Sequence, residues 1–264
     1  MKKDSLNNQQ VNSEHTGADK GFQYYWDLEG DFIEEINRSG SDGWSGVIVT
    51  SERDNGGFDR KICIKKQENY FSYSSVNFIR GRLTVENEAR NLIFCHRNGL
   101  TVPEVIFYGK RDESGDRQGI LVTQFLDNFT SLDDILYKGE HKLRCNTELR
   151  RVLIDKVARE VRKLHRLRIV HNNLYPKHIF IDTNTLEVAF IDFEKGKKKF
   201  TAGKCVFRDL EVLNRYTPMI SRADKLRFLK IYFGVTVFNS KLRKLWVQIA
   251  KVAIRKQERK NRKR

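Results

Sequence analysis

The segment from His171 to Asp192 constrains the fold of this chain more than any other feature. A polar loop, His-Asn-Asn-Leu-Tyr-Pro-Lys-His, begins at His171. An amphipathic helix is predicted before it, because apolar residues recur at three- and four-residue steps from Leu149 to Leu164. Two short strands, residues 179–181 and 188–191, are predicted after it, around a turn at 182–184. Asp192 ends the second strand. A carboxylate there is unfavourable unless it is paired or bound to a cation, so Asp192 is a candidate functional residue.

The loop and the Asp-Phe pair match a pattern found in protein kinases. There the catalytic loop is His-Arg-Asp, four residues and Asn, and a later element is Asp-Phe-Gly. This chain keeps the loop histidine, the Leu-x-Pro interior and the Asp-Phe pair at plausible spacing. Asn173 stands where the catalytic-base aspartate is expected, and Glu194 replaces the glycine. The same segment therefore predicts a kinase-like fold but lacks the aspartate that acts as the catalytic base in protein kinases.

The rest of the chain predicts an α+β, two-lobed protein-kinase-like fold. Strands are predicted at 32–36, 47–49, 61–66, 105–108 and 119–125, with one helix at 83–98 that Gly99 ends as a C-cap. Further helices are predicted at 207–216, 222–232 and 240–256. The expected organisation is a small β-rich N-lobe with one key helix and a larger, mainly helical C-lobe. Its divisions are a disordered polar tail (1–20), the N-lobe (21–130), the C-lobe (131–256) and a basic C-terminal tail (257–264).

Composition limits the compartment and the partners. No apolar run approaches the ~18 residues of a membrane span, and the polar N-terminus is not expected to be a secretory signal. The four cysteines are far apart without a Cys-x-x-Cys pair, which favours reduced thiols in the cytosol over a zinc site. A net charge of +16 favours an anionic partner: nucleic acid, an anionic membrane surface or a phosphorylated substrate. Charge does not choose among these.

The chain resembles the lipopolysaccharide core kinase family, which includes Kdo and heptose kinases and an InaA-type branch, over roughly residues 30 to 235. Four segments carry the resemblance: Ile64-Lys65-Lys66-Gln67-Glu68-Asn69, Glu88-Ala89-Arg90-Asn91-Leu92, His171 to Phe180, and Ile191-Asp192-Phe193-Glu194-Lys195. The resemblance implies a protein-kinase-like fold, use of ATP and Mg²⁺, and phosphorylation of a sugar in the inner core of lipopolysaccharide. The InaA-type branch also lacks the catalytic aspartate.

The resemblance assigns roles in nucleotide binding. Lys65 on the third strand is expected to hold the α- and β-phosphates of ATP, because its ammonium can meet two phosphate oxygens. Glu88 is expected to pair with it, and Glu86 is the competing carboxylate. The glycine-rich loop over the phosphates would contain Gly40, Gly43 and Gly46, although a plain hairpin turn explains the same residues.

The remaining site residues belong to the polar loop and the strand end. Asp192 is expected to be the main Mg²⁺ ligand, and a turn cap is the alternative. His178 is either a second metal ligand or a structural hydrogen-bonding residue, and His171 is expected to brace the loop. Asn173 is placed at the acceptor hydroxyl. Asparagine orients a hydroxyl but does not take its proton, and losing a general base lowers the rate by roughly 10²–10⁴.

The C-terminal helix has two interpretations. Its apolar residues Leu242, Leu245, Trp246, Ile249, Val252 and Ala253 share a face, with lysines and arginines mostly off it. Such a helix either lies on anionic lipid or packs on the large lobe before a frayed basic tail.

Two functions follow from these residues. One is a cytoplasmic kinase, peripheral at the inner membrane, that acts on a lipopolysaccharide core precursor. The alternative is a pseudokinase that binds nucleotide or lipid and regulates a partner, because of Asn173. No nucleic-acid motif is present, so specific nucleic-acid binding is not expected.

Overall fold

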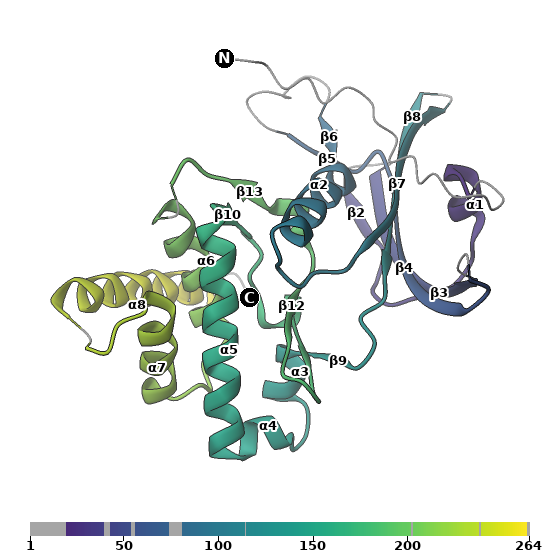
Figure 1. Cartoon of the computed structure of the whole chain (residues 1–264). Helices are drawn as coiled ribbons and strands as arrows, with labels where there is room; N and C mark the ends of the chain where they lie inside the picture. Colours follow the sequence, from purple (N-terminus) through teal and green to yellow (C-terminus); the bar gives the residue numbers. More distant parts are fainter. Residues whose placement is uncertain are drawn as a thin grey trace. The chain divides into compact units, whose positions relative to one another are not determined.

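The computed structural model describes residues 20–39, 43–53, 56–73, 81–113, 115–201, 203–237 and 239–262 (Figure 1). The chain forms two compact units. The first consists of the residues up to Val85 together with Val105–Phe125. The second consists of Glu86–Glu104 and everything from Leu126 onward. The predicted division at residue 130 placed 86–104 in the first lobe, whereas this stretch is part of the second compact unit.

The first unit is built on an antiparallel sheet in the order β1-β3-β4-β8-β7, with β2 also paired to β3. The long strands are β3 (Gly43–Arg53), β4 (Asp59–Glu68), β7 (Val105–Glu113) and β8 (Asp116–Gln124). β5 (Phe71–Ser72) and β6 (Arg82–Leu83) form a separate small hairpin. Alternation along β4 buries Ile62 and Ile64 and turns Cys63 and Lys65 to the opposite face.

A helix that the sequence pattern did not predict covers one face of this sheet. α1 (Phe22–Asp27) places Tyr25 in a core with Ile48, Ile62, Ile64, Ile120 and Val122, and Phe22 and Trp26 pack against that core. Its six residues are too few to show a helical period, so its stability comes from the buried aromatic side chains.

The predicted strand at 32–36 is interrupted in the structure. β1 (Asp31–Phe32) and β2 (Asn37–Ser39) both pair with β3, but the register shifts by two residues between them. Residues 33–36 form the bulge, and the side chain of Ile33 is 54% exposed. Three of the predicted apolar positions therefore lie outside the core, and the strand is two short segments.

The second unit is mainly helical. α5 (Thr147–Arg166) buries Leu153, Val157, Val161 and Leu164 of the predicted stripe, although Val152 is 44% exposed. α7 (Arg222–Phe233) packs against α5, and α8 (Ser240–Asn261) packs against α6 (Gly203–Arg215). α2 (Thr84–Arg97) ends at Gly99, whose φ of +73° gives the predicted C-cap. The short helices α3 (Leu132–Tyr137) and α4 (Lys142–Cys145) were not predicted.

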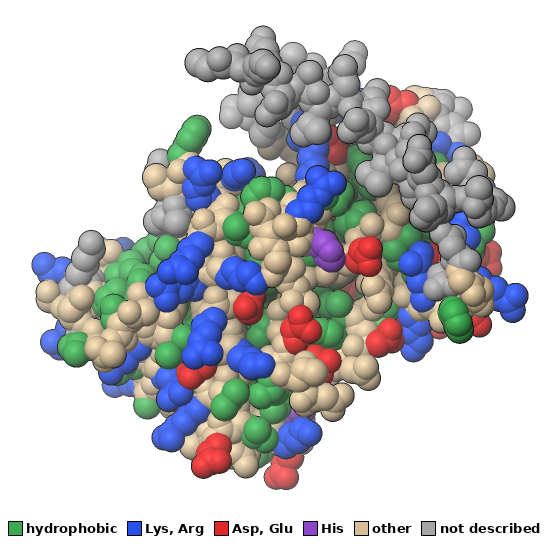
Figure 2. Space-filling view, viewed as in Figure 1, with side chains coloured by type: hydrophobic (Ala, Val, Ile, Leu, Met, Phe, Trp, Pro, Cys, Tyr) green, Lys and Arg blue, Asp and Glu red, His purple; other side chains and the backbone are tan. Residues whose placement is uncertain are grey.

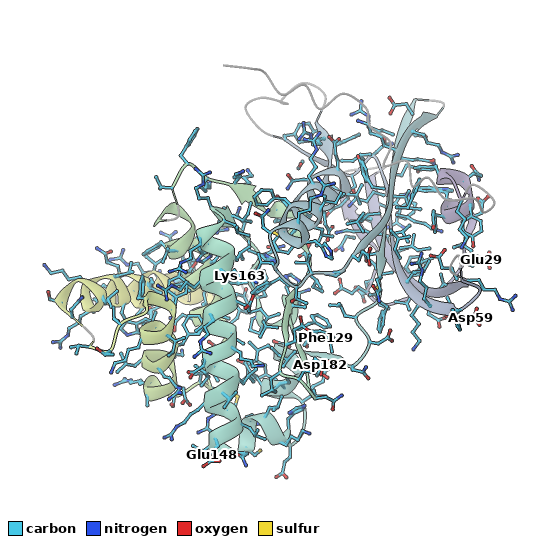
Figure 3. All side chains as sticks on the ribbon, in the orientation of Figure 1. Glu29, Asp59, Phe129, Glu148, Lys163 and Asp182 are labelled. Atoms are coloured by element: carbon cyan, nitrogen blue, oxygen red, sulfur yellow. The ribbon has the colours of Figure 1, made fainter. Side chains whose placement is uncertain are left out.

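A small sheet in the second unit carries the predicted hairpin. Its order is β12-β11-β9, with β9 (Phe129–Ser131), β11 (Ile179–Asp182) and β12 (Val188–Phe190) all antiparallel. Phe129 faces Asp182 in the register, and the two side chains lie near each other in Figure 3. The carboxylate of Asp182 accepts the backbone N–H of Asn184 and Thr185, which closes the predicted turn. A second short pair, β10 (Ile169–Val170) with β13 (Lys197–Lys198), brackets the polar loop and the Asp-Phe segment.

Candidate active site

The polar loop that begins at His171 is fixed by the buried carboxylate of Asp209. Asp209 of α6 has no exposed surface, and its Oδ2 accepts the backbone N–H of His171 at 2.7 Å. Its Oδ1 accepts the N–H of Asn172 at 2.9 Å. Hydrogen bonds to an ionised acceptor are stronger than neutral ones, so Asp209 fixes the loop backbone where the loop starts. Sequence reasoning missed this residue, because its partners lie 37 and 38 residues earlier in the chain.

Two further side chains extend this anchor to neighbouring helices. His165 at the end of α5 donates Nε2–H to Asp209 Oδ2 at 3.0 Å. Its Nδ1 then accepts the hydroxyl of Tyr232 on α7 at 2.6 Å. All three side chains are buried, so Tyr232, His165 and Asp209 join α7, α5 and α6 beneath the loop. We call this set the loop anchor.

The loop and the strand end meet at three predicted residues. The side-chain amide of Asn173 donates from Nδ2 to Asp192 Oδ2 at 2.9 Å. His178 donates from Nδ1 to the backbone carbonyl of Asn173 at 2.8 Å, and the same nitrogen lies 3.3 Å from Asp192 Oδ2. Since a carboxylate only accepts, the nitrogen of the Asn173 amide must face Asp192. Its oxygen is therefore turned the other way.

Asp192 has an uncommon backbone conformation. Its φ of 62° and ψ of 59° lie in the left-handed region, which is rare for a residue that is not glycine. Such strain is held by surrounding contacts and is concentrated at functional sites. The side chain of Asp192 keeps 20% of its surface exposed, unlike Asp209. A partly exposed carboxylate in a strained position fits a ligand-binding role better than a turn cap.

The segment after Asp192 is clamped by two asparagines of α2. Asn87 donates from Nδ2 to the carbonyl oxygens of Glu194 and Gly196, at 2.7 and 2.9 Å. Asn91, one turn later, donates to the carbonyls of Phe193 and Gly196, both at 3.1 Å. A Cβ at Gly196 would lie 2.7 Å from Asn91 Nδ2, so the close approach needs glycine there. Asparagine is unfavourable inside a helix, and this pair four residues apart was a usable signal that sequence reasoning passed over.

Asn172 occupies the position of the kinase loop arginine. Its φ of +64° suits asparagine, and its side-chain amide donates to the carbonyl of Lys195 at 2.8 Å. In many protein kinases, segments of this kind are ordered by pairing arginine with a phosphorylated residue. Here neutral amides from Asn172, Asn87 and Asn91 hold the segment.

His171 contacts both the residue before Asp192 and the Asp-Phe pair. Its Nε2–H donates to the carbonyl of Ile191 at 3.0 Å, and its ring lies 4.6 Å from that of Phe193, centre to centre. Nδ1 is buried and has no hydrogen-bond partner among the described residues. Burial lowers the pKa of His171 to about 4, although the nearby Asp209 carboxylate acts in the opposite direction. His171 is therefore neutral near pH 7 and connects the loop to Ile191, which lies between β12 and Asp192.

The predicted nucleotide-binding lysine, Lys65, and its neighbour Lys66 are both in β4 and have different surroundings. Lys66 donates from Nζ to the carbonyls of Trp26 and Leu28, at 2.6 and 2.7 Å, and so closes the end of α1. Lys65 points to the other face, which it shares with Gln67. Gln67 bonds there to Ser45 Oγ at 3.1 Å and to Thr84 Oγ1 at 2.7 Å. Lys65 and Lys66 therefore lie on opposite faces of β4.

The remaining predicted nucleotide-binding residues are partly described. Glu88 of α2 is 6% exposed, whereas Glu86 pairs with Arg90 at 2.9 Å on the same helix. Gly43 and Gly46 lie in β3, where a Cβ would meet Ser39 O at 2.5 Å and the Phe32 ring at 2.8 Å respectively. Gly40 lies outside the described residues.

The C-terminal helix packs on the second unit. Its apolar face buries Leu242, Ile249 and Ala253 against α6, and Lys256 bonds to the buried Glu211 of α6 at 2.5 Å. This favours the packing interpretation over an apolar face lying on lipid. The helix also continues to Asn261, past the predicted end at 256. No described helix has the length and apolarity needed to cross a membrane.

The donors at the site suit Mg²⁺. The described residues contain no group of three or more His, Cys, Asp or Glu side chains arranged around a metal position. Mg²⁺ is commonly held by one or two carboxylates together with substrate phosphates and water, so a site with the single carboxylate of Asp192 is compatible with this ion. His178 uses Nδ1 as a hydrogen-bond donor, which prevents that atom from binding a metal while the bond stands.

The fold and the loop define a protein-kinase-like protein. The structure of "WaaP in complex with acyl carrier protein" superimposes with a TM-score of 0.64 at 20% identity, covering 89% of this chain and 91% of that one. This confirms the predicted α+β kinase-like fold.

Residues 23–232 match the model of the lipopolysaccharide kinase (Kdo/WaaP) family, and the chain belongs to this family. It is 27% identical to Protein InaA of Escherichia coli (strain K12) over 216 residues, which is 81% of this chain and 96% of InaA. It is 26% identical to lipopolysaccharide core heptose(I) kinase WaaP of Pseudomonas aeruginosa over 149 residues, or 52% of this chain and 55% of WaaP.

Proposed function

We propose that this protein transfers the γ-phosphoryl group of ATP to a sugar hydroxyl of the lipopolysaccharide inner core. Membership of the lipopolysaccharide kinase family supports the substrate class. The observation that carries the proposal is the 2.9 Å bond between Asn173 and Asp192, on a loop that the loop anchor fixes. Metal-assisted phosphoryl transfer uses an aspartate to hold Mg²⁺, and the strained, partly exposed Asp192 suits that role.

Each site residue has a defined part in this mechanism. Asp192 would hold Mg²⁺, which neutralises charge on the phosphates when it is bound. Lys65 would hold the α- and β-phosphates, with Glu88 as its partner and the Gly43–Gly46 strand segment near the nucleotide. Asn173, whose amide nitrogen is engaged by Asp192, presents its oxygen to accept a hydrogen bond from the sugar hydroxyl and orient it.

The missing base limits the expected rate. An amide oxygen cannot take a proton near neutral pH, so the hydroxyl proton must leave with the transferred phosphate or through water. Phosphoryl transfer has a loose transition state and relies on positioning and metal electrostatics, so turnover without a base is expected to be slow rather than absent. We further propose that the protein works in the cytoplasm, peripherally at the inner membrane, where a lipid-anchored core precursor is accessible.

The alternative is a pseudokinase that binds nucleotide or lipid and regulates a partner. The amide at Asn173 favours it, while the retained Asp192 and the orientation of Lys65 favour an active site. Calorimetric titration with ATP, with and without Mg²⁺, tests nucleotide binding. Mg²⁺-dependent binding that Lys65→Ala weakens at least tenfold and Lys61→Ala leaves unchanged is the expected result. No heat of binding at millimolar nucleotide would contradict the kinase proposal and leave a nucleotide-free pseudokinase.

A further inference from the structure

One exposed aromatic side chain projects from the loop that follows β13. Phe200 is 92% exposed, the largest exposed fraction among the exposed large hydrophobic side chains described. Single exposed apolar residues are ordinary, but this one follows three consecutive lysines, Lys197 to Lys199. No acidic residue lies between Lys195 and Thr201. Figure 2 shows a hydrophobic side chain projecting beside lysine and arginine side chains in the region where Figure 1 places this loop.

The base of the loop is firmly attached to the second unit. Lys197 and Lys198 pair with Val170 and Ile169 of β10. The backbone N–H of Lys199 donates to the carbonyl of Arg168 at 2.7 Å. The ammonium of Lys198 also lies 4.5 Å from the centre of the Phe94 ring on α2, a cation–π contact. Phe200 is thus presented from a fixed base and not at the end of a loose tail.

Further basic side chains surround this base. Arg166 and Arg168, at the end of α5 and in the turn after it, are exposed beside the strand that pairs with β13. The side chain of Lys195 is 62% exposed. We call Phe200 with Lys197, Lys199, Arg166 and Arg168 the basic tip. Its composition, one exposed aromatic group on a segment with several basic residues, complements a surface that is anionic outside and apolar below.

Other partners fit the basic tip less well. Protein interfaces have an apolar core in which lysine is depleted, whereas here a single exposed aromatic directly follows three lysines. Single-stranded nucleic acid is bound along a basic groove with successive aromatic side chains, and the basic tip offers one aromatic on a projection. A lipid surface needs neither a groove nor a second aromatic.

We propose that the basic tip docks this protein on an anionic lipid bilayer, with Phe200 entering the interface and its cations contacting the lipid head groups. Lys197 to Phe200 follow Asp192 by only five to eight residues, and all residues of the tip belong to the same compact unit as Asp192. Docking there would bring the phosphoryl-transfer site to the surface that holds a lipid-anchored acceptor. This link between docking and catalysis rests on the proposed function. The docking itself needs neither nucleotide nor acceptor.

Vesicle sedimentation tests the docking directly. The full chain is mixed with phosphatidylcholine vesicles and with vesicles that also contain phosphatidylglycerol. We expect binding only to the anionic vesicles, with Phe200→Ser weakening it about tenfold. The double variant Lys197→Gln/Lys199→Gln should weaken it by about fivefold for each lysine, and added salt should reduce it further. Met219→Ser, which removes a side chain that is 70% exposed elsewhere, is the matched apolar control and should change nothing.

A second charge control separates the basic tip from the C-terminal helix. Arg259 and Arg262 are exposed near the end of α8. The variant Arg259→Gln/Arg262→Gln should retain most of the vesicle binding. Equal losses in this variant and in the lysine variant would mean that binding follows net charge alone, and would overturn the proposal.

A fluorescence measurement reports the depth of the tip. Phe200→Trp adds an indole to the three natural tryptophans, so its signal is taken as the difference from the natural protein. A blue shift and quenching by brominated lipid, seen only with anionic vesicles, are expected. An unshifted indole, or binding to RNA without binding to vesicles, would overturn the docking proposal. Calorimetry with ATP on Phe200→Ser keeps the two proposals distinct, because nucleotide binding should be unchanged whether or not the tip contacts lipid.

Discussion

Replacing Asp209 with asparagine should destabilise the second unit through the loop it anchors. The aspartate has no exposed surface and accepts three hydrogen bonds, from His165 Nε2, the His171 N–H and the Asn172 N–H. Asparagine has nearly the same shape but only one acceptor oxygen. Whichever way the amide turns, its NH₂ group faces at least one buried N–H.

The size of the effect follows from the bonds that are lost. A hydrogen bond to a charged group contributes about 1.5–3 kcal/mol, and an unsatisfied buried donor adds a further penalty. Losing one or two of the three bonds should therefore lower the free energy of unfolding by about 3 kcal/mol. For a unit of this size, that corresponds to a fall in Tm of about 6–12 °C.

Thermal unfolding followed by circular dichroism provides the assay, with Asp155→Asn as the matched control. Asp155 forms a two-bond pair with Arg227, both bonds 2.6 Å, but the arginine side chain is 40% exposed. Such a pair contributes about 0.5–1 kcal/mol, so the control should shift Tm by less than about 4 °C. If Asp209→Asn shifts Tm no more than the control does, the loop anchor does not hold the loop.

Three further results are expected. Burial lowers the pKa of His171 to about 4, whereas the same side chain in the unfolded chain titrates near 6.5, so between these pH values the unfolded state binds one more proton. The free energy of unfolding should therefore fall as pH falls from 6.5 to 4. His171→Gln should flatten this pH profile, measured by urea titration. Asn173→Asp places a carboxylate oxygen about 2.9 Å from Asp192 Oδ2, so the Tm of this variant should fall without Mg²⁺ and recover when Mg²⁺ is added. The phosphoryl-transfer rate of the variant should stay flat or fall. A large gain in that rate would mark the natural protein as a weakened kinase. Asn91→Leu removes two bonds to the segment after Asp192 and should lower Tm by about 4–8 °C, and an unchanged Tm would contradict the clamp.

The parts of the site that the sequence predicted depend on local patterns. The loop histidine, the hairpin, the Asp-Phe pair and the glycine that ends α2 all lie in segments whose periodicity or turn residues are visible within a few positions. The structure separates Lys65 from Lys66, because the two residues lie on opposite faces of β4, a distinction that the sequence analysis did not draw.

The parts that were missed depend on distant partners. Asp209 is one of many acidic residues in the sequence, and only the fold places its carboxylate under His171, 38 residues away. Asn87 bonds to segments more than 100 residues later in the chain. Residues 33–36 form a bulge because β3 pairs on both sides of them, which no local pattern reveals. α8 extends past its predicted end because lysine and arginine have high helix propensity, so the basic segment after residue 256 can continue the helix.

Phosphoryl transfer is the measurement closest to the central claim. Purified protein is incubated with Mg²⁺, ATP labelled in the γ-phosphate and isolated core lipopolysaccharide, and label in the lipopolysaccharide is followed with time. We expect slow, Mg²⁺-dependent incorporation that Asp192→Asn abolishes and Asp182→Asn, a carboxylate in a turn, leaves intact. Nucleotide binding without any label in the lipopolysaccharide, under conditions where the Asp192→Asn variant binds ATP more weakly, would contradict the kinase function and identify the protein as a pseudokinase.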